Sequence, residues 1–258
     1  MGRYNSSVYR VRPLMQVVEK DITAFHKLLS LVGISPLGMP NKCFYDGKNK
    51  QPEEISLKPS KRHLAALISY MAEKDHTGVS VTNTMRRQLF FPDPNLPASR
   101  AEACRAALAE LEKSYDALAS TNRAWYVFEG FTNPDIFIEG DDYVIVCEGK
   151  WTESHITTKT TNLAADNEYR NQMVRHIQGA LNATKKKVYA FYIVDAECGY
   201  TTDLTKAALA QQLDMETIKI PAAEKAQIME AFCGYTTWQD IPKVIPNVDF
   251  KKKEEIGK

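Results

Sequence analysis

The sequence lacks the features that mark several classes of protein. Its 258 residues contain no apolar run near the ~20 residues of a membrane span, and no apolar stretch typical of a secretory signal near the N-terminus. The five cysteines are scattered and form no C-x-x-C pair, which argues against a zinc or redox centre and favours a reducing compartment. We therefore expect a cytoplasmic protein with no membrane partner.

An excess of charge of one sign is also missing. Lys plus Arg number 33 and Asp plus Glu number 32, so the formal net charge is +1. No global field attracts a polyanion, and a site for nucleic acid must be built locally. Hydrophobic residues at 44% and charged residues at 25% are typical of a globular protein, which excludes collagen-like, disordered and coiled-coil chains.

The first part of the chain, residues 1–97, predicts a helical region packed on the core of the protein. Apolar periodicity predicts helices over 14–32 and 60–73, and Ser60 can cap the second. Between them, residues 36–52 are rich in proline and glycine and predict a loop.

A long helix is expected after the proline-rich break at 91–97. Ser99 and Glu102 form an S-x-x-E capping box that would begin this helix, and the periodicity continues to about Ser120. At ~100° per residue, one face carries an apolar stripe. Its members are Cys104, Leu108, Leu111, Tyr115 and Leu118. Glu112 lies at the edge of the stripe and is the helical acid best placed to enter a site, with Glu110 and Glu102 as competitors.

Three strands are expected next, over 124–129, 135–139 and 143–151. The runs I-F-I and V-I-V-C in the last two are continuously apolar, which is typical of strands covered on both faces. A helix over 164–183 and a strand over 187–195 come after them.

The C-terminal part predicts helices over 203–213 and 222–232, a capped turn over 237–240 and a charged tail over 246–258. From the capping box onward the order is helix, three strands, helix, strand. This order and the doubly covered strands predict an α/β fold, with residues 98–245 as a domain after the helical region.

Polar residues interrupt the apolar strands at particular places. Asp135 begins one expected strand, directly after Pro134. Glu148 and Lys150 are two apart near the end of the next strand, so they project to the same face.

The turn between these two strands decides how close the acids come. A two-residue turn at Gly140 and Asp141 would place Asp135 opposite Val146 and diagonal to Glu148, ~7 to 8 Å away at Cα. Two carboxylates at that distance can converge on one hard cation. A register shift by one residue would turn Asp135 to the other face.

These residues and their order resemble the PD-(D/E)XK nuclease superfamily over about 100 residues, roughly 99–195. Within it, the chain is similar to uncharacterised bacterial members with E-G-K-x-T-E, here Glu148 to Glu153, and R-x-Q-M-x-R-H, here Arg170 to His176. The resemblance implies a restriction-endonuclease-like core of helix, three-strand meander, helix and strand, with a helical N-terminal extension and a helical C-terminal tail.

The resemblance also implies a role for each matched position. Asp135 and Glu148 would bind Mg²⁺, for which Mn²⁺ can substitute, with the backbone carbonyl of Gly149 as a third ligand. Lys150 would orient or activate the attacking water and offset charge on the phosphorane. Many members add an acid from the first helix, and Glu112 is the candidate here.

The second motif adds candidates for substrate binding. Gln172 and His176 are four apart on one edge of the expected helix, and Arg170 lies on the other edge. Gln172 would hold substrate or a metal-bound water, and Arg170, Arg175 and His176 would contact phosphates. Thr158 belongs to an expected substrate-facing loop. Exonuclease-like branches carry Q-x-x-x-Y here, so His in place of Tyr leaves directionality open, and a structural role for Gln172 and His176 is the alternative.

The function predicted from these residues is Mg²⁺-dependent hydrolysis of phosphodiester bonds in nucleic acid, with DNA as the expected substrate. Two alternatives stay open. One is a nucleic-acid-binding or assembly module of the same fold without turnover, and the other is a hydrolase of a small phosphate ester. A homodimer would suit an enzyme that cuts two strands, but no dimer face is visible in the sequence.

Overall fold

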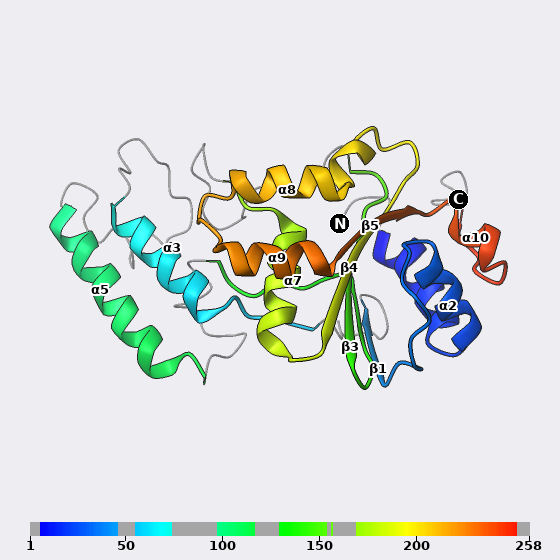
Figure 1. Ribbon diagram of the computed structural model, residues 1–258, viewed down its shortest axis with the longest axis horizontal. Helices are drawn as coiled ribbons and strands as arrows, with labels where there is room; N and C mark the ends of the chain where they lie inside the picture. Colours follow the sequence, from blue (N-terminus) through cyan, green and yellow to red (C-terminus); the bar gives the residue numbers. More distant parts are fainter. Residues whose placement is uncertain are drawn as a thin grey trace.

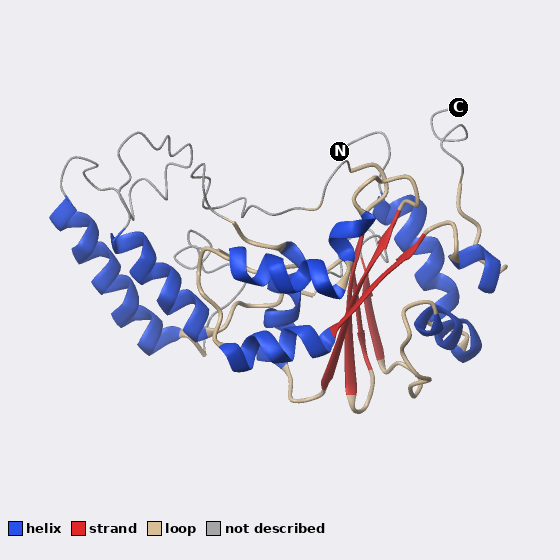
Figure 2. Ribbon diagram, turned by 45° about the horizontal axis from the view of Figure 1, so that its top comes forward, coloured by secondary structure: helices blue, strands red, loops and turns tan. Residues whose placement is uncertain are grey.

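The computed structural model describes residues 6–45, 55–73, 97–116, 129–153, 156 and 169–251. In this part, one five-stranded sheet lies between helices on both of its faces (Figures 1 and 2). Its strands are β1 (Lys42–Tyr45), β2 (Ile136–Glu139), β3 (Tyr143–Gly149), β4 (Lys187–Val194) and β5 (Phe232–Thr237). The predicted α/β class is confirmed.

The sheet is mixed, and its strands lie in chain order from β1 to β5. β1 and β3 are antiparallel to β2, whereas β4 and β5 are parallel to β3. Helix α7 (Gln172–Ala183) lies between β3 and β4 in the sequence, as a parallel connection requires. The carboxyl ends of β3 and β4 therefore meet at one end of the sheet.

Side chains alternate along each strand between the two faces of the sheet, and each face packs against its own set of helices. Tyr143, Ile145 and Cys147 of β3 pack in a core with α1 (Arg12–Val18), α2 (Ile22–Ser30) and α10 (Ile241–Val244), whereas Val144 and Val146 pack against α7, α8 (Lys206–Met215) and α9 (Ala222–Ala231). All seven residues of β3 are buried, which explains its unbroken apolar run.

Helices α3 (Lys61–Glu73) and α5 (Pro97–Ser114) form a pair at one end of the molecule, away from the sheet (Figure 1). Cys104, Leu111 and the partly buried Leu108 and Tyr115 pack with Leu64, Leu67 and Ile68 of α3. The predicted stripe on α5 is confirmed as far as Tyr115, and it faces α3. Leu118 lies outside the described residues.

Several helix boundaries differ from the prediction for local reasons. The helix expected over 14–32 is two helices, because the Asp21 carboxylate accepts from Thr23 N–H at 2.8 Å and starts α2. α7 begins at Gln172, capped by Asn171, whose Oδ1 accepts from Val174 N–H at 3.1 Å. The predicted cap Ser60 does accept from His63 N–H, at 3.1 Å.

Two strands were not predicted. β1 lies in the segment expected to be a loop, and it pairs with β2 from Lys42 opposite Glu139 to Tyr45 opposite Ile136. β5 begins at Phe232, where a helix was expected to end. The strand expected over 124–129 lies outside the described residues, except that Glu129 is in a turn. The sheet therefore takes strands from both sides of residue 97.

The remaining elements agree closely with expectation. β4, α8, α9 and the capped turn at Thr237 are present, and the Thr237 hydroxyl donates to Asp240 Oδ2 at 2.6 Å. Among the helices of the described residues, none combines the length and apolar character that crossing a membrane requires.

Candidate functional site

Glu148 lies at the carboxyl end of β3 on the face covered by α7. Tyr192 of β4 is its neighbour in the parallel ladder. Two residues further, Lys150 returns to the same face, and its Nζ donates to Glu148 Oε1 at 2.8 Å. The prediction that these two side chains share a face is confirmed.

The first turns of α7 supply two more partners to Glu148. Gln172 Nε2 donates to Glu148 Oε1 at 2.8 Å, while Gln172 Oε1 accepts from Lys150 Nζ at 3.1 Å. His176, one turn later, places Nε2 3.0 Å from Glu148 Oε2. The i, i+4 spacing of Gln172 and His176 thus brings both side chains onto one carboxylate.

The turn that joins β2 to β3 differs from the predicted one. Gly140 N–H donates to Tyr143 O at 3.0 Å, so the two turn residues are Asp141 and Asp142. A Cβ on Gly140 would lie 2.1 Å from the Tyr143 ring. Glycine is needed at this position because the tyrosine ring packs directly over it.

This turn changes the register by two residues. Ile136 lies opposite Cys147, and continuing the ladder places Asp135 opposite Glu148, not opposite Val146 as predicted. A shift of two residues keeps every side chain on its face. The two acids therefore come from directly facing positions, closer than the predicted diagonal.

Asp135 is held by the backbone of the E-G-K motif. Its Oδ2 accepts from Gly149 N–H at 2.8 Å. A Cβ on Gly149 would lie 3.0 Å from the Trp238 ring and 3.4 Å from Asp135 Oδ2. The glycine of the motif thus leaves room for the Trp238 ring and the Asp135 carboxylate close to the strand.

The electrostatics of the cluster favour the charged form of both central groups. Burial alone would raise the pKa of Glu148, but the Lys150 ammonium and the hydrogen bond from His176 outweigh it and lower the pKa to about 2. Burial would lower the pKa of Lys150, but the Glu148 carboxylate raises it above its ordinary value. Lys150 is therefore an ammonium at neutral pH.

The cluster around Glu148 has a buried centre and a more exposed edge. The side chains of Glu148 and Lys150 are 5% and 9% exposed, whereas Asp135 and Gln172 are only half-buried. Solvent and a ligand would therefore reach the cluster from the side of Asp135 and Gln172.

The donor set suits a hard cation. Asp135 and Glu148 supply two carboxylates on facing positions, and Mg²⁺ takes one or two carboxylates and completes its shell with water. Among the described residues, no group of three or more His, Cys, Asp or Glu side chains is arranged to hold a metal. A fully protein-made cage of the zinc or calcium kind is therefore not present in this part of the chain.

Arg170 and Arg175, the predicted phosphate contacts, have partners inside the protein in the described structure. Both donate to the buried carboxylate of Glu129, from Arg170 Nη2 at 2.9 Å and Arg175 Nε at 3.0 Å. Arg170 Nη1 also donates to Glu216 Oε2 at 3.3 Å. Arg170 precedes α7 and is not on the helix edge, because α7 begins only at Gln172.

His63 of α3 completes this second cluster. Its Nε2 lies 2.5 Å from Glu129 Oε2, and burial lowers the pKa of its ring. The guanidinium groups of Arg170 and Arg175 keep the pKa of Glu129 well below its usual range, against the opposing effect of burial. We call Glu129, His63, Arg170, Arg175 and Glu216 the Glu129 cluster.

His176 is a buried connecting residue. Its ring is 1% exposed, and its Nδ1 lies 2.7 Å from the hydroxyl of Thr132. With Nε2 on Glu148, neither ring nitrogen is directed at solvent. In the described structure both ring nitrogens of His176 thus have partners inside the protein. One of them is Thr132, which sequence reasoning missed.

Two other predicted site residues do not join the cluster. Glu112 is on α5, at the end of the molecule away from β3, where it pairs with Lys61 Nζ at 2.8 Å and is 70% exposed (Figure 1). Thr158 lies outside the described residues. In the described structure Glu112 therefore does not lie beside Glu148.

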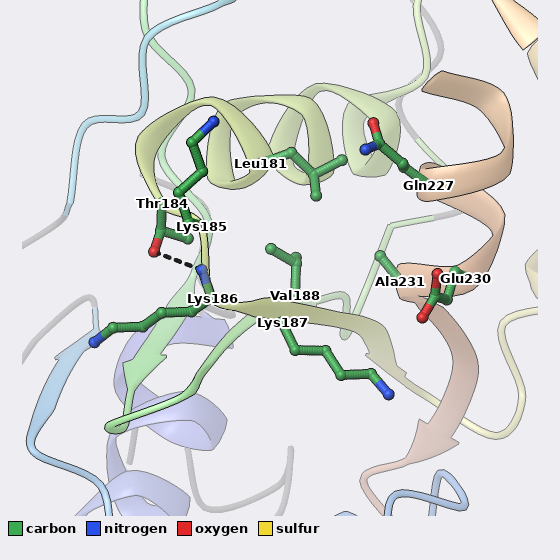
Figure 3. Close-up of a pocket in the computed structure, with 9 residues that line it drawn as sticks. All are labelled: Leu181, Thr184, Lys185, Lys186, Lys187, Val188, Gln227, Glu230 and Ala231. Atoms are coloured by element: carbon green, nitrogen blue, oxygen red, sulfur yellow. Dashed lines mark hydrogen bonds between the residues drawn. The ribbon is translucent and has the colours of Figure 1, made fainter. Parts of the chain in front are cut away.

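A separate hollow of about 270 Å³ lies at the other end of β4 (Figure 3). Lys185, Lys186 and Lys187 line it, but their amines diverge, and Lys186 Nζ donates to Glu139 Oε1 at 2.7 Å. The lysine run therefore lies at the solvated start of β4 and does not form a focused anion site.

Comparison with known proteins does not add a relative to this picture. No protein-family model, curated protein or solved structure matches the chain. The interpretation of the site therefore depends on its own residues and geometry.

Proposed function

We propose that this protein hydrolyses phosphodiester bonds of nucleic acid, with DNA as the first substrate to test, as a Mg²⁺-dependent enzyme of the PD-(D/E)XK type. The observation that carries the proposal is the meeting of Asp135, Glu148 and Lys150 at one end of the sheet. The hairpin of β2 and β3, followed by α7 and the parallel strand β4, supports a restriction-endonuclease-like core.

Asp135 and Glu148 would hold the metal ion. When bound, Mg²⁺ supplies Lewis acidity next to a phosphate oxygen and favours a nucleophilic water near neutral pH. In the described structure, the Glu148 carboxylate is instead satisfied by Lys150, Gln172 and His176. These donors keep the carboxylate ionised and oriented.

Lys150 would act as a charge stabiliser. Because its pKa is raised, it is a poor acceptor for the proton of a water molecule. Its ammonium can instead offset the negative charge that develops on the phosphorane. Gln172, which bonds both Lys150 and Glu148, would fix the direction of that ammonium.

The test is cleavage of plasmid DNA, single-stranded DNA and RNA by the purified protein with Mg²⁺, with Mn²⁺ and with EDTA. We expect metal-dependent cleavage that falls at least about 100-fold in Glu148→Ala and in Lys150→Ala. Circular dichroism must show that both variants are folded. A small phosphodiester in the same assay tests the alternative substrate class.

Matched controls come from another ion pair of the same sheet. Glu139 and Lys186 pair at 2.7 Å, far along β2 from Asp135, so Glu139→Ala and Lys186→Ala should cleave like the wild type. Cleavage that persists in both site variants would remove the active-site assignment. Binding of nucleic acid without cleavage under every metal condition would favour the non-catalytic module.

A further inference from the structure

Thr132 is a buried polar residue that has no role in the proposed reaction so far. It is connected to Glu148 through one residue, His176. It is 6% exposed, and its hydroxyl is 2.7 Å from His176 Nδ1. His176 Nε2 in turn lies 3.0 Å from Glu148 Oε2. Threonine, histidine and glutamate thus form a continuous chain of hydrogen bonds that ends on a proposed metal ligand.

The chemistry of the three groups fixes the direction of each bond. A carboxylate only accepts, so Nε2 of His176 must carry the hydrogen that lies toward Glu148. In a neutral imidazole Nδ1 is then an acceptor, and the Thr132 hydroxyl donates to it. The Glu148 carboxylate thus sets the Nε2–H tautomer, and the Thr132 hydroxyl supplies the donor that Nδ1 then needs.

The backbone holds the Thr132 hydroxyl in place before any ligand arrives. Thr132 and Leu57 exchange two backbone hydrogen bonds, each 2.9 Å long. Arg175 Nη2 donates to the carbonyl oxygens of Glu129 and Phe131, at 3.0 and 3.1 Å, which fixes the segment just before Thr132.

A glycine on α7 makes the close approach possible. A Cβ on Gly179 would lie 2.8 Å from Leu57 Cβ and 3.4 Å from the Thr132 methyl carbon. Because Gly179 has no side chain, the bridge between Leu57 and Thr132 packs directly on the helix that carries His176. The missing side chain at Gly179 therefore allows α7 and the Leu57–Thr132 bridge to pack closely.

We propose that Thr132 is a positioning residue, whose hydroxyl on His176 Nδ1 orients the imidazole so that Nε2–H holds Glu148 Oε2 in the geometry that binds a divalent cation. The effect of Thr132 on catalysis rests on the proposed function. The chain of hydrogen bonds from Thr132 through His176 to Glu148, which we call the relay, can be tested without assuming that function.

The first experiment reads the relay in the full-length protein without metal. The ring ¹⁵N chemical shifts of His176 report the tautomer and the hydrogen bond to Nδ1 in the wild type, Thr132→Val and Thr132→Ser. We expect the Nε2–H form in all three proteins, because the Glu148 carboxylate remains. The Nδ1 shift of the serine variant should match that of the wild type, whereas in the valine variant it should move to that of an acceptor nitrogen without a donor. If valine does not pack, Thr132→Ala makes the same comparison with a smaller side chain.

The second experiment measures the consequence for the metal site, with Mn²⁺ alone as the probe. Direct partners of metal ligands are typically worth about 10- to 100-fold in affinity, and Thr132 acts through such a partner, His176. Thr132→Val should therefore weaken Mn²⁺ binding and cleavage by about 10-fold, the lower end of that range. Thr132→Ser should restore both. The control is Thr184→Val, which removes a hydroxyl that accepts from Lys186 N–H at the other end of β4 and should change neither.

The outcomes separate the two proposals. Unchanged His176 shifts and unchanged Mn²⁺ affinity in Thr132→Val overturn the positioning role. A wild-type protein that neither binds Mn²⁺ nor cleaves overturns the proposed function, while the ¹⁵N measurement still decides the relay. A serine variant as impaired as valine also contradicts the relay, because serine keeps the hydroxyl.

Discussion

Two buried glutamates receive hydrogen bonds from α7 and its N-terminal flank, and their partners differ in kind. Glu129 faces the guanidinium groups of Arg170 and Arg175 together with His63. Glu148 faces one ammonium, one amide and one imidazole. Arginine is permanently charged and forms rigid forked contacts, whereas lysine is a mobile point charge. The Glu129 cluster is therefore suited to holding elements of the fold together, and we call it a structural joint. At the Glu148 site, in contrast, the partners of the carboxylate can rearrange.

The positions of the two glutamates agree with this difference. The Glu129 cluster connects α3, the turn at Glu129, the N-terminal flank of α7 and Glu216 after α8. It thereby fastens the α3 and α5 pair to the body of the molecule. Glu148, by contrast, lies at a sheet end beside the half-buried Asp135 and Gln172, where a ligand can approach.

The largest expected effect on stability is at Glu129. Glu129→Gln keeps the shape but leaves two buried guanidinium groups short of negative charge, which should lower the free energy of unfolding by about 3 to 5 kcal/mol. Urea unfolding followed by circular dichroism measures it. A loss below about 1 kcal/mol would mean that the cluster is not a structural joint.

Glu148→Gln should destabilise less, by about 1 to 3 kcal/mol. The amide oxygen still accepts from Gln172 or Lys150, and Lys150 also feels the charges of Asp135 and Glu153. The same urea titration gives the value. If Glu148→Gln cost as much as Glu129→Gln, the proposed contrast between a fixed joint and a rearrangeable site would be wrong.

The free energy of unfolding should depend on pH because of His63 in the Glu129 cluster. Burial lowers the pKa of His63 in the folded protein, so the unfolded chain binds a proton first as the pH falls. Stability should therefore decrease below about pH 6.5, the ordinary histidine pKa. The contribution of Glu129, whose folded pKa is also lowered, begins to disappear only below about pH 4.5, so the window of His63 begins at a higher pH than that of Glu129.

His63→Gln removes the first of these windows. The free energy of unfolding of the variant, measured between pH 5 and pH 7.5, should depend less on pH than that of the wild type. The other four of the five histidines are common to both proteins and cancel in the difference. An identical pH dependence would show that His63 is not held neutral against Glu129.

The parts of the fold that sequence reasoning predicted are those with a local signal. The apolar runs of β2, β3 and β4 and the cap at Ser60 each lie within a few residues of the chain. The shared face of Glu148 and Lys150 follows from strand alternation alone. The strand β1 lies inside the proline- and glycine-rich stretch over 36–52, which indicates a loop, and it becomes a strand by pairing with β2.

The Glu129 cluster could not be predicted for the same reason. His63 and Glu129 are 66 residues apart, and Arg170 and Glu216 are 46 apart, so no spacing rule connects them. Tertiary packing also decided the role of α5. Its apolar stripe was identified correctly, but the sequence does not say which element the stripe faces.

The smallest expected effect is at Glu112, and it tests whether the apolar stripe of α5 faces α3 and not the Glu148 site. Because the stripe faces α3, Glu112 pairs with Lys61 in solvent, and such pairs contribute little. Glu112→Ala should change the free energy of unfolding by less than about 0.5 kcal/mol and leave cleavage unchanged, and Lys61→Ala should match it. The plasmid assay with Mg²⁺ and the urea titration measure both quantities. A loss of cleavage in Glu112→Ala, with Lys61→Ala unaffected, would mean that α5 reaches the Glu148 site when substrate binds, and the separation of the two regions would have to be given up.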